Sequence, residues 1–148
     1  MSSFVTSGKP SGSEMKWLTS KILIWSISGS SSVEMYKGSL KLIGNTPLVR
    51  LQNIKIPNDV EIWLKYEAGN PTGSYKDRMA LSVLTTAINN GVIKKGDRII
   101  EYTGGSTGSS LAFVSASLGL NFTAIFSDAF SDSKRQTMEA FGANVIIV

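Results

Sequence analysis

Residues 98–148 decide the fold, and they read RIIEYTGGSTGSSLAFVSASLGLNFTAIFSDAFSDSKRQTMEAFGANVIIV. Three short apolar runs alternate with two stretches of helical length, and a glycine ends each of these stretches. The predicted strands are 98–102, 122–126 and 144–148, and the predicted helices are 107–118 and 131–141. This βαβαβ order predicts an α/β fold, a three-layer αβα arrangement in which right-handed crossovers join a parallel sheet with helices on both faces. Ligands of such sheets gather at the C-terminal ends of the strands.

Two further strands and a helix are expected before this region. Residues 47–51 form a short apolar run, and residues 61–67 alternate at the period of a strand. Trp63, in the second run, is most simply a core residue. A helix of about four turns is expected from Lys76 to the Asn-Asn-Gly stop at 89–91. Its apolar positions recur at helical spacing and are Ala80, Leu81, Leu84, Ala87 and Ile88.

Composition divides the chain into two parts. Residues 1–34 are rich in serine and bury too little apolar surface to offset the entropy of ordering, so we expect a disordered leader, with Met35 as a candidate original start. The whole chain has 148 residues and 42% hydrophobic content, which suffices for one domain with a core, placed at 35–148. Its last strand has no polar tail, so we expect this domain to be truncated at its C-terminus.

The absence of cysteine and histidine removes several chemistries. Disulfides, thiolate catalysis, His-dependent triads and the usual zinc sites are excluded, so no metal site is expected. The net charge of +4 comes from interspersed charges, and Lys94-Lys95 and Lys134-Arg135 are the only adjacent basic pairs. We therefore expect no nucleic-acid partner, no membrane partner and a cytoplasmic protein. The basic excess modestly favours anionic small ligands.

A lysine stands at the start of the first predicted helix, in the run NPTGSYKDR at 70–78. Lysine becomes a nucleophile when its surroundings lower its pKa, and with an aldehyde cofactor such as pyridoxal phosphate it forms a Schiff base. Taken alone, Lys76 is more simply a solvated lysine at a helix start. Asp77 and Arg78 are interpreted as first-turn residues, with Asp77 favourable at the positive end of the helix dipole and Arg78 an ion-pair partner.

A glycine-rich turn joins the strand 98–102 to the next helix. Helix N-termini present N–H groups without partners, and glycines let a ligand approach the backbone, so the turn suits a carboxylate or a phosphate. The alternative is a flexible helix cap made by Ser106 or Thr107. The turn matches neither the G-x-x-x-x-G-K-[ST] nor the G-x-G-x-x-G motif, which argues against a nucleotide. Its candidate binding residues are Thr103, Gly104, Gly105, Ser106 and Thr107.

Three segments together resemble the cysteine synthase and cystathionine β-synthase family of pyridoxal-phosphate enzymes. They are IGNTPLV at 43–49, NPTGSYKDR at 70–78 and TGGSTG at 103–108, in the family's order and spacing. The resemblance runs from about residue 35 to residue 148. It implies the N-terminal portion of a fold type II enzyme, a small-molecule amino acid as the substrate, and a homodimer in the full-length form.

The resemblance also implies roles for particular residues. Lys76 would bind pyridoxal phosphate covalently and then act as general base. The loop of Thr103, Gly104, Gly105, Ser106 and Thr107 would hold the substrate's α-carboxylate, and Ser106 would also contact the cofactor. The implied reaction is β-replacement on an activated serine, in which O-acetylserine and sulfide give cysteine and acetate.

Two departures from the family bear on these expectations. The family's loop usually reads Thr-Ser-Gly-Asn-Thr-Gly, and Gly104 and Ser106 stand here for its Ser and Asn, which places the chain in a side branch and leaves the substrate open. The family's loop for the cofactor phosphate would follow Val148, so we expect weak or no turnover from these 148 residues alone.

Two alternative functions stay open. One is a serine or threonine dehydratase of the same fold, which eliminates the β-substituent instead of replacing it. The other is a truncated, non-catalytic module that binds a partner through the edge strand 145–148.

Overall fold

The computed structural model describes residues 38–53, 55, 57, 60–127 and 129–148. The predicted leader and Met35 lie outside these residues. In chain order the elements are η1 (Ser39–Leu42), β1 (Leu48–Arg50), β2 (Trp63–Lys65), η2 (Glu67–Gly69), α2 (Lys76–Asn89), β3 (Arg98–Tyr102), α3 (Ser106–Leu118), β4 (Asn121–Phe126), α4 (Asp132–Ala140) and β5 (Asn144–Ile147), where η marks a 3-10 helix. Among the helices of this part of the chain, none has the length and apolar character needed to cross a membrane.

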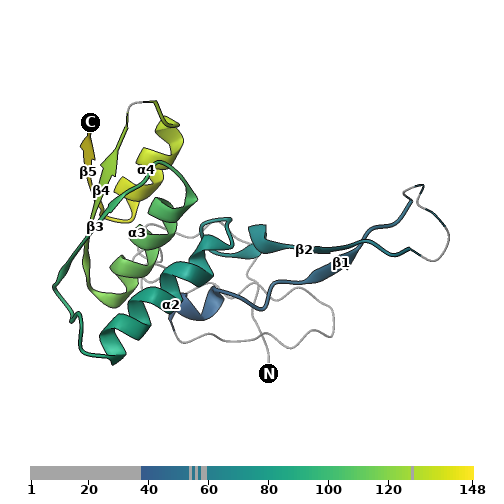
Figure 1. The fold of residues 1–148 in the computed structure, drawn as a ribbon, viewed down its shortest axis with the longest axis horizontal. Coiled ribbons are helices and arrows are strands. Elements are labelled where there is room, and N and C mark those ends of the chain that lie inside the picture. Colours follow the sequence, from purple (N-terminus) through teal and green to yellow (C-terminus); the bar gives the residue numbers. More distant parts are fainter. Residues whose placement is uncertain (1–37, 54, 56, 58–59, 128) are drawn as a thin grey trace, which may run out of the picture. The chain divides into compact units, whose positions relative to one another are not determined.

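A parallel sheet in the order β3-β4-β5 carries the C-terminal half (Figure 1). Its register pairs Ile100 with Thr123 and Ile125 with Ile146. Because α3 connects β3 to β4 and α4 connects β4 to β5, the predicted βαβαβ order is confirmed. Gly119 follows α3 with a φ of 71°, a left-handed conformation that glycine adopts without strain, so the predicted helix stop is confirmed as well.

The helices lie on one face of this sheet (Figure 1). In β4, Phe122 and Phe126 are buried in the core that the strands share with the helices. On the opposite face, Ile100 and Tyr102 are 58% and 61% exposed. The cause is topological, since strands added in one direction by right-handed crossovers carry both crossover helices on the same side. The predicted α/β class with a parallel sheet is confirmed, but the described residues do not form the second helical layer.

Helix α3 is the centre of the core. Its middle turns are buried all round, because α2 packs on one side of it, α4 on another, and β4 beneath it. Phe113 of α3 meets Phe141 edge to face, with ring centroids 5.3 Å apart. The buried apolar side chains that join these elements are Ala80, Leu84, Leu111, Ala112, Val114, Phe122, Ala124, Phe126 and Met138.

Strands β1 and β2 form a separate antiparallel pair. Pairing continues past β2, where the Tyr66 N–H donates to the Pro47 carbonyl at 2.9 Å, and η2 then replaces the end of the predicted strand 61–67. The prediction that Trp63 is a core residue is wrong, because its side chain is 48% exposed. Its indole N–H instead donates to Glu61 Oε2 at 3.1 Å. A two-stranded pair buries little on either face, so strand periodicity alone did not imply a core position.

Candidate active site

Lys76 is the first residue of α2, and the turn before it fixes how the helix starts. The Gly73 N–H donates to the Asn70 carbonyl at 2.8 Å, and Gly73 has a φ of 74°, which favours glycine. The Lys76 N–H donates to Ser74 Oγ at 3.1 Å. The segment 70–76 therefore folds locally into a closed turn that delivers Lys76 to the N-terminal end of the helix.

Among the described residues, no acidic side chain forms an ion pair with the Lys76 amine. Its side chain is half-buried, and Nζ lies 4.9 Å from the centroid of the Tyr75 ring, whose face attracts a cation. The ion pairs formed by the described residues do not include Lys76. An amine that no carboxylate holds in an ion pair is available to react with a carbonyl group.

Arg78 anchors the lysine turn to the segment before it. Its guanidinium binds Glu67 in a bidentate pair, with Nε 2.8 Å from Oε2 and Nη2 2.9 Å from Oε1. Thr46 Oγ1 donates to Glu67 Oε1 at 2.5 Å, and Asn70 Nδ2 donates to Oε2 at 2.9 Å. The bonds from Arg78 and then Thr46 lower the pKa of Glu67 to about 2, and Glu67 raises the pKa of Arg78. The predicted ion-pair role of Arg78 is confirmed.

The same cluster connects two segments that the sequence analysis had linked only by resemblance. Asn70 Oδ1 accepts a hydrogen bond from the Gly44 N–H at 2.9 Å, and Lys65 Nζ donates to the Thr46 carbonyl. The turn at 44–47 is thereby joined to the lysine turn at 70–76. Within the described residues, the turn at 44–47 thus helps to hold the lysine turn in place.

The glycine-rich loop begins where β3 ends. Thr103 is buried, and its N–H donates to the Ile125 carbonyl at 2.9 Å, which extends the sheet ladder by one residue. The N-cap of α3 is Gly105, without a side-chain bond, so the alternative in which Ser106 or Thr107 caps the helix is wrong. Both residues lie in the first helical turn, and among the described residues their hydroxyls form no hydrogen bond. The N–H groups of a first turn have no helical partners, so the loop presents several donors.

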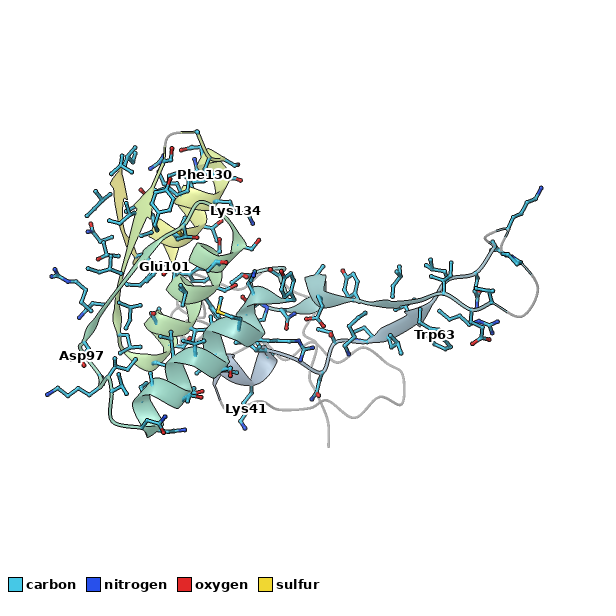
Figure 2. The ribbon with its side chains drawn as sticks, viewed as in Figure 1. Lys41, Trp63, Asp97, Glu101, Phe130 and Lys134 are labelled. Atoms are coloured by element: carbon cyan, nitrogen blue, oxygen red, sulfur yellow. The ribbon has the colours of Figure 1, made fainter. Side chains whose placement is uncertain are left out.

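The glycines of the loop differ in what surrounds them. A Cβ on Gly104 would overlap the Phe130 ring, which belongs to the loop between β4 and α4 (Figure 2). A Cβ on Gly108 would come within 2.5 Å of Met138 Sδ, so this position also excludes a side chain. A Cβ on Gly105 would meet no heavy atom within 4 Å. The loop is therefore packed tightly behind Gly104 and Gly108 and open beside Gly105.

Helices α2 and α3 pack against each other (Figure 1). This packing brings the lysine turn next to α3, the loop helix, which follows the glycine-rich loop. Thr72 Oγ1, in the lysine turn, lies 3.2 Å from Ser110 Oγ. Ser110 follows Ser106 by about one helical turn. No hydrogen bond among the described residues joins Lys76 directly to the loop. Helix packing, the Thr72 contact and a hydrogen bond from Ser110 Oγ to Asp77 Oδ1 at 2.6 Å bring the two motifs together.

Sequence reasoning missed three residues of this region, which are Thr72, Ser110 and Phe130. Nothing local marks Ser110 and Phe130, because Ser110 contacts Thr72 and Phe130 contacts Gly104, partners far away in the chain. Thr72 bonds to Asp77, five residues further on, but its spacing from Asp77 has no distinctive sequence pattern. A hollow in the exposed sheet face lies elsewhere, since residues such as Ile100, Thr123 and Ile146 line it and no residue of the two motifs does.

A family model described as pyridoxal-phosphate dependent enzyme matches residues 40–148. Cysteine synthase B of Escherichia coli (strain K12) is 47% identical over 106 residues, which are 72% of this chain and 35% of that protein. O-ureido-L-serine synthase of Streptomyces lavendulae is 40% identical over 113 residues, 76% of this chain and 35% of that protein. The chain therefore spans about a third of the length of the curated relatives it matches.

Solved structures agree with these relatives. The crystal structure of cysteine synthase from Entamoeba histolytica superposes with a TM-score of 0.74 at 35% identity, over 83% of this chain and 38% of that one. The crystal structure of O-ureido-L-serine synthase gives a TM-score of 0.73 at 39% identity, over 78% of this chain and 36% of that one.

Proposed function

Because the chain belongs to the family of pyridoxal-phosphate-dependent enzymes, we propose that its protein catalyses β-replacement on an activated serine. In this reaction O-acetylserine and sulfide give cysteine and acetate, and the similarity to cysteine synthases supports it. The observation that carries the proposal is the Lys76 amine, which has no ion-pair partner among the described residues and stands at the head of a helix packed against the loop helix α3.

The residues present fit pyridoxal phosphate. The Lys76 amine is a suitable group to bond the aldehyde carbon, and the Ser106 hydroxyl is free to reach the ring hydroxyl. The space beside Gly105, where a Cβ would meet nothing within 4 Å, leaves room next to the loop. When bound, the cofactor supplies an electron sink for the charge that develops at the substrate Cα.

The chain's own residues perform the remaining tasks. We assign to Lys76 Nζ the removal of the substrate's Cα proton, since an amine nitrogen can accept a proton as a general base. The first-turn N–H groups of α3, together with the hydroxyls of Thr103, Ser106 and Thr107, would bind the α-carboxylate at the positive end of the helix dipole. Gly104 and Gly105 would let the carboxylate approach the backbone.

Covalent labelling tests the role of Lys76. The complete gene product is incubated with pyridoxal phosphate, reduced with borohydride and digested, and the modified peptide is mapped by mass spectrometry. We expect the label on Lys76 and none on the Lys76→Ala variant, whereas Lys94→Ala, which removes an exposed lysine, should be labelled like the wild type. A label on another amine, or no label at all, would reject the assignment and favour the non-catalytic partner-binding alternative.

Substrate assays separate the remaining reactions. O-acetylserine with sulfide should yield cysteine and acetate, and serine or threonine alone should yield no keto acid. Keto-acid formation without sulfide would instead establish the dehydratase alternative.

We also propose that residues 35–148 are the N-terminal part of the catalytic domain, after the leader at 1–34, and that the complete protein works in the cytoplasm as a homodimer on a small amino acid. The match of the family model to residues 40–148 supports the domain assignment. Sedimentation of the complete gene product tests the dimer, and a monomer at micromolar concentration would refute it.

A further inference from the structure

Asp77, next to the proposed catalytic lysine, has a buried carboxyl group whose hydrogen-bond donors in the described part of the chain are all neutral. Its side chain is 0% exposed. Oδ2 accepts the Thr72 N–H at 2.8 Å, and Oδ1 accepts the hydroxyls of Thr72 at 2.5 Å and of Ser110 at 2.6 Å. Its position in the first turn of α2 agrees with the sequence interpretation, but its complete burial and its partners on other segments go beyond a helix-dipole role.

The hydroxyl groups of Thr72 and Ser110 both serve the Asp77 carboxyl group. Thr72 and Ser110 each carry one hydroxyl proton, and each hydroxyl donates it to Oδ1. The 3.2 Å separation of the two hydroxyl oxygens is then a contact rather than a second hydrogen bond. A buried carboxylate without donors is costly, so each hydroxyl is needed where it stands.

Asp77 and its two partners lie in three segments that the proposed reaction requires to be held together. Thr72 lies in the turn that precedes Lys76, Asp77 lies in α2 directly after it, and Ser110 lies in α3 one turn after the proposed carboxylate loop. Resting on the proposed function, we propose that Asp77, with Thr72 and Ser110, is a positioning residue that sets where the Lys76 amine stands relative to the substrate loop.

The expected size of the effect follows from the geometry of proton transfer. A misplacement of about 1 Å between reacting groups costs roughly a hundredfold in rate. Thr72→Val keeps the shape of the side chain and the backbone N–H bond but removes one hydroxyl from Oδ1. We therefore expect this variant to fold and to carry the cofactor on Lys76, with kcat lowered about tenfold to a hundredfold and KM changed much less.

The chain offers a matched rescue and a matched control. Thr72→Ser keeps the hydroxyl and should leave kcat within about threefold of the wild type, since it loses only the γ-methyl group and the χ1 restriction that this methyl imposes. Thr85→Val makes the same substitution in α2, where the Thr85 hydroxyl bonds only to carbonyls of its own helix at Leu81 and Ser82, and it should leave kcat unchanged. Ser110→Ala approaches the same carboxylate from α3 and should lower kcat as Thr72→Val does.

The experiment uses the complete gene product loaded with pyridoxal phosphate, with O-acetylserine and sulfide as substrates. It measures kcat, KM, the borohydride label on Lys76, and the urea midpoint of each variant. Wild-type kcat in a labelled, folded Thr72→Val would overturn the positioning role and leave the proposed function intact. Unfolding of both Thr72→Val and Ser110→Ala, with Thr85→Val folded, would overturn it in favour of a purely structural role. An unlabelled wild type would overturn both proposals.

Discussion

Restoring the family's usual serine at position 104 should destabilise this protein, although it would normally count as a conservative change. A Cβ at this position overlaps ring atoms of Phe130, so Gly104→Ser requires the ring to move. Phe130 packs edge to face on Phe126, with ring centroids 5.7 Å apart and an interplanar angle of 68°. Displacing the ring forfeits about 0.5–1.5 kcal/mol of that contact, and overpacking costs about 1–3 kcal/mol in total.

The stability of the double variant isolates the cause. Phe130 is 42% exposed, so Phe130→Ala alone should cost about 1 kcal/mol, less than the 3–5 kcal/mol of a buried phenylalanine. With the ring gone, Gly104→Ser should cost less than about 0.5 kcal/mol, which makes the two changes strongly non-additive. Gly105→Ser is the matched control, because a side chain there enters open space.

The assay is urea unfolding of the complete gene product in the four members of the cycle. A coupling free energy of about 1–2 kcal/mol between positions 104 and 130 is expected, with an unchanged m-value. Additive costs for the two substitutions would show that the Phe130 ring does not occupy the space beside Gly104, and the steric explanation for the missing serine would fail.

Three further predictions concern stability. The pKa of Glu67 is lowered from 4.5 to about 2, chiefly by Arg78, so the ionised Glu67 stabilises the fold above pH ~4.5 and this stabilisation is lost as the pH falls toward 2. The difference in unfolding free energy between the wild type and Glu67→Gln, measured by urea unfolding, should therefore shrink over that pH range. A constant difference would refute the pairing. Gly108→Ala should lower the unfolding free energy by about 1–3 kcal/mol, because the added Cβ would clash with Met138 Sδ, whereas Gly105→Ala should lower it by less than about 1 kcal/mol. Equal melting temperatures for the two variants would contradict this. Met138→Ala should lower the unfolding free energy by about 2–5 kcal/mol in urea unfolding, since the Met138 side chain is fully buried. A decrease of less than about 1 kcal/mol would refute its role in the core.

Strand and helix positions in the C-terminal half followed from the sequence because the signals there are local and agree. The predicted strand 98–102 has the same bounds as β3. Helix α3 ends at Gly119 because this glycine adopts the left-handed conformation, a purely local cause. The second helical layer could not be judged in this way. The general rule for parallel crossovers gives their right hand, but the sequence does not give the direction in which successive strands are added, and that direction decides which face the helices cover.

The candidate site likewise contains residues that local sequence signals predict and residues whose contacts come from distant parts of the chain. Lys76 and the loop at 103–107 are visible in the sequence because a turn, a helix start and several glycines coincide there. Asp77 was interpreted as a first-turn residue favourable at the helix dipole, and its hydrogen bond from Ser110, 33 positions away, makes it a buried link between helices. Such a partner leaves no trace in local spacing, so the residues that orient a site are harder to infer than those that form it.

The two departures from the family's loop therefore have different physical meanings. Gly104 is explained by space, because the Phe130 ring fills the volume that a serine side chain would need. Ser106 has no such explanation in its packing, since its hydroxyl has no partner among the described residues and it stands in the open first turn of α3. A hydroxyl reaches less far than an asparagine amide, so this position changes the chemistry offered to a bound ligand. Any difference in ligand preference that arises within this loop is thus expected to depend on Ser106 more than on Gly104.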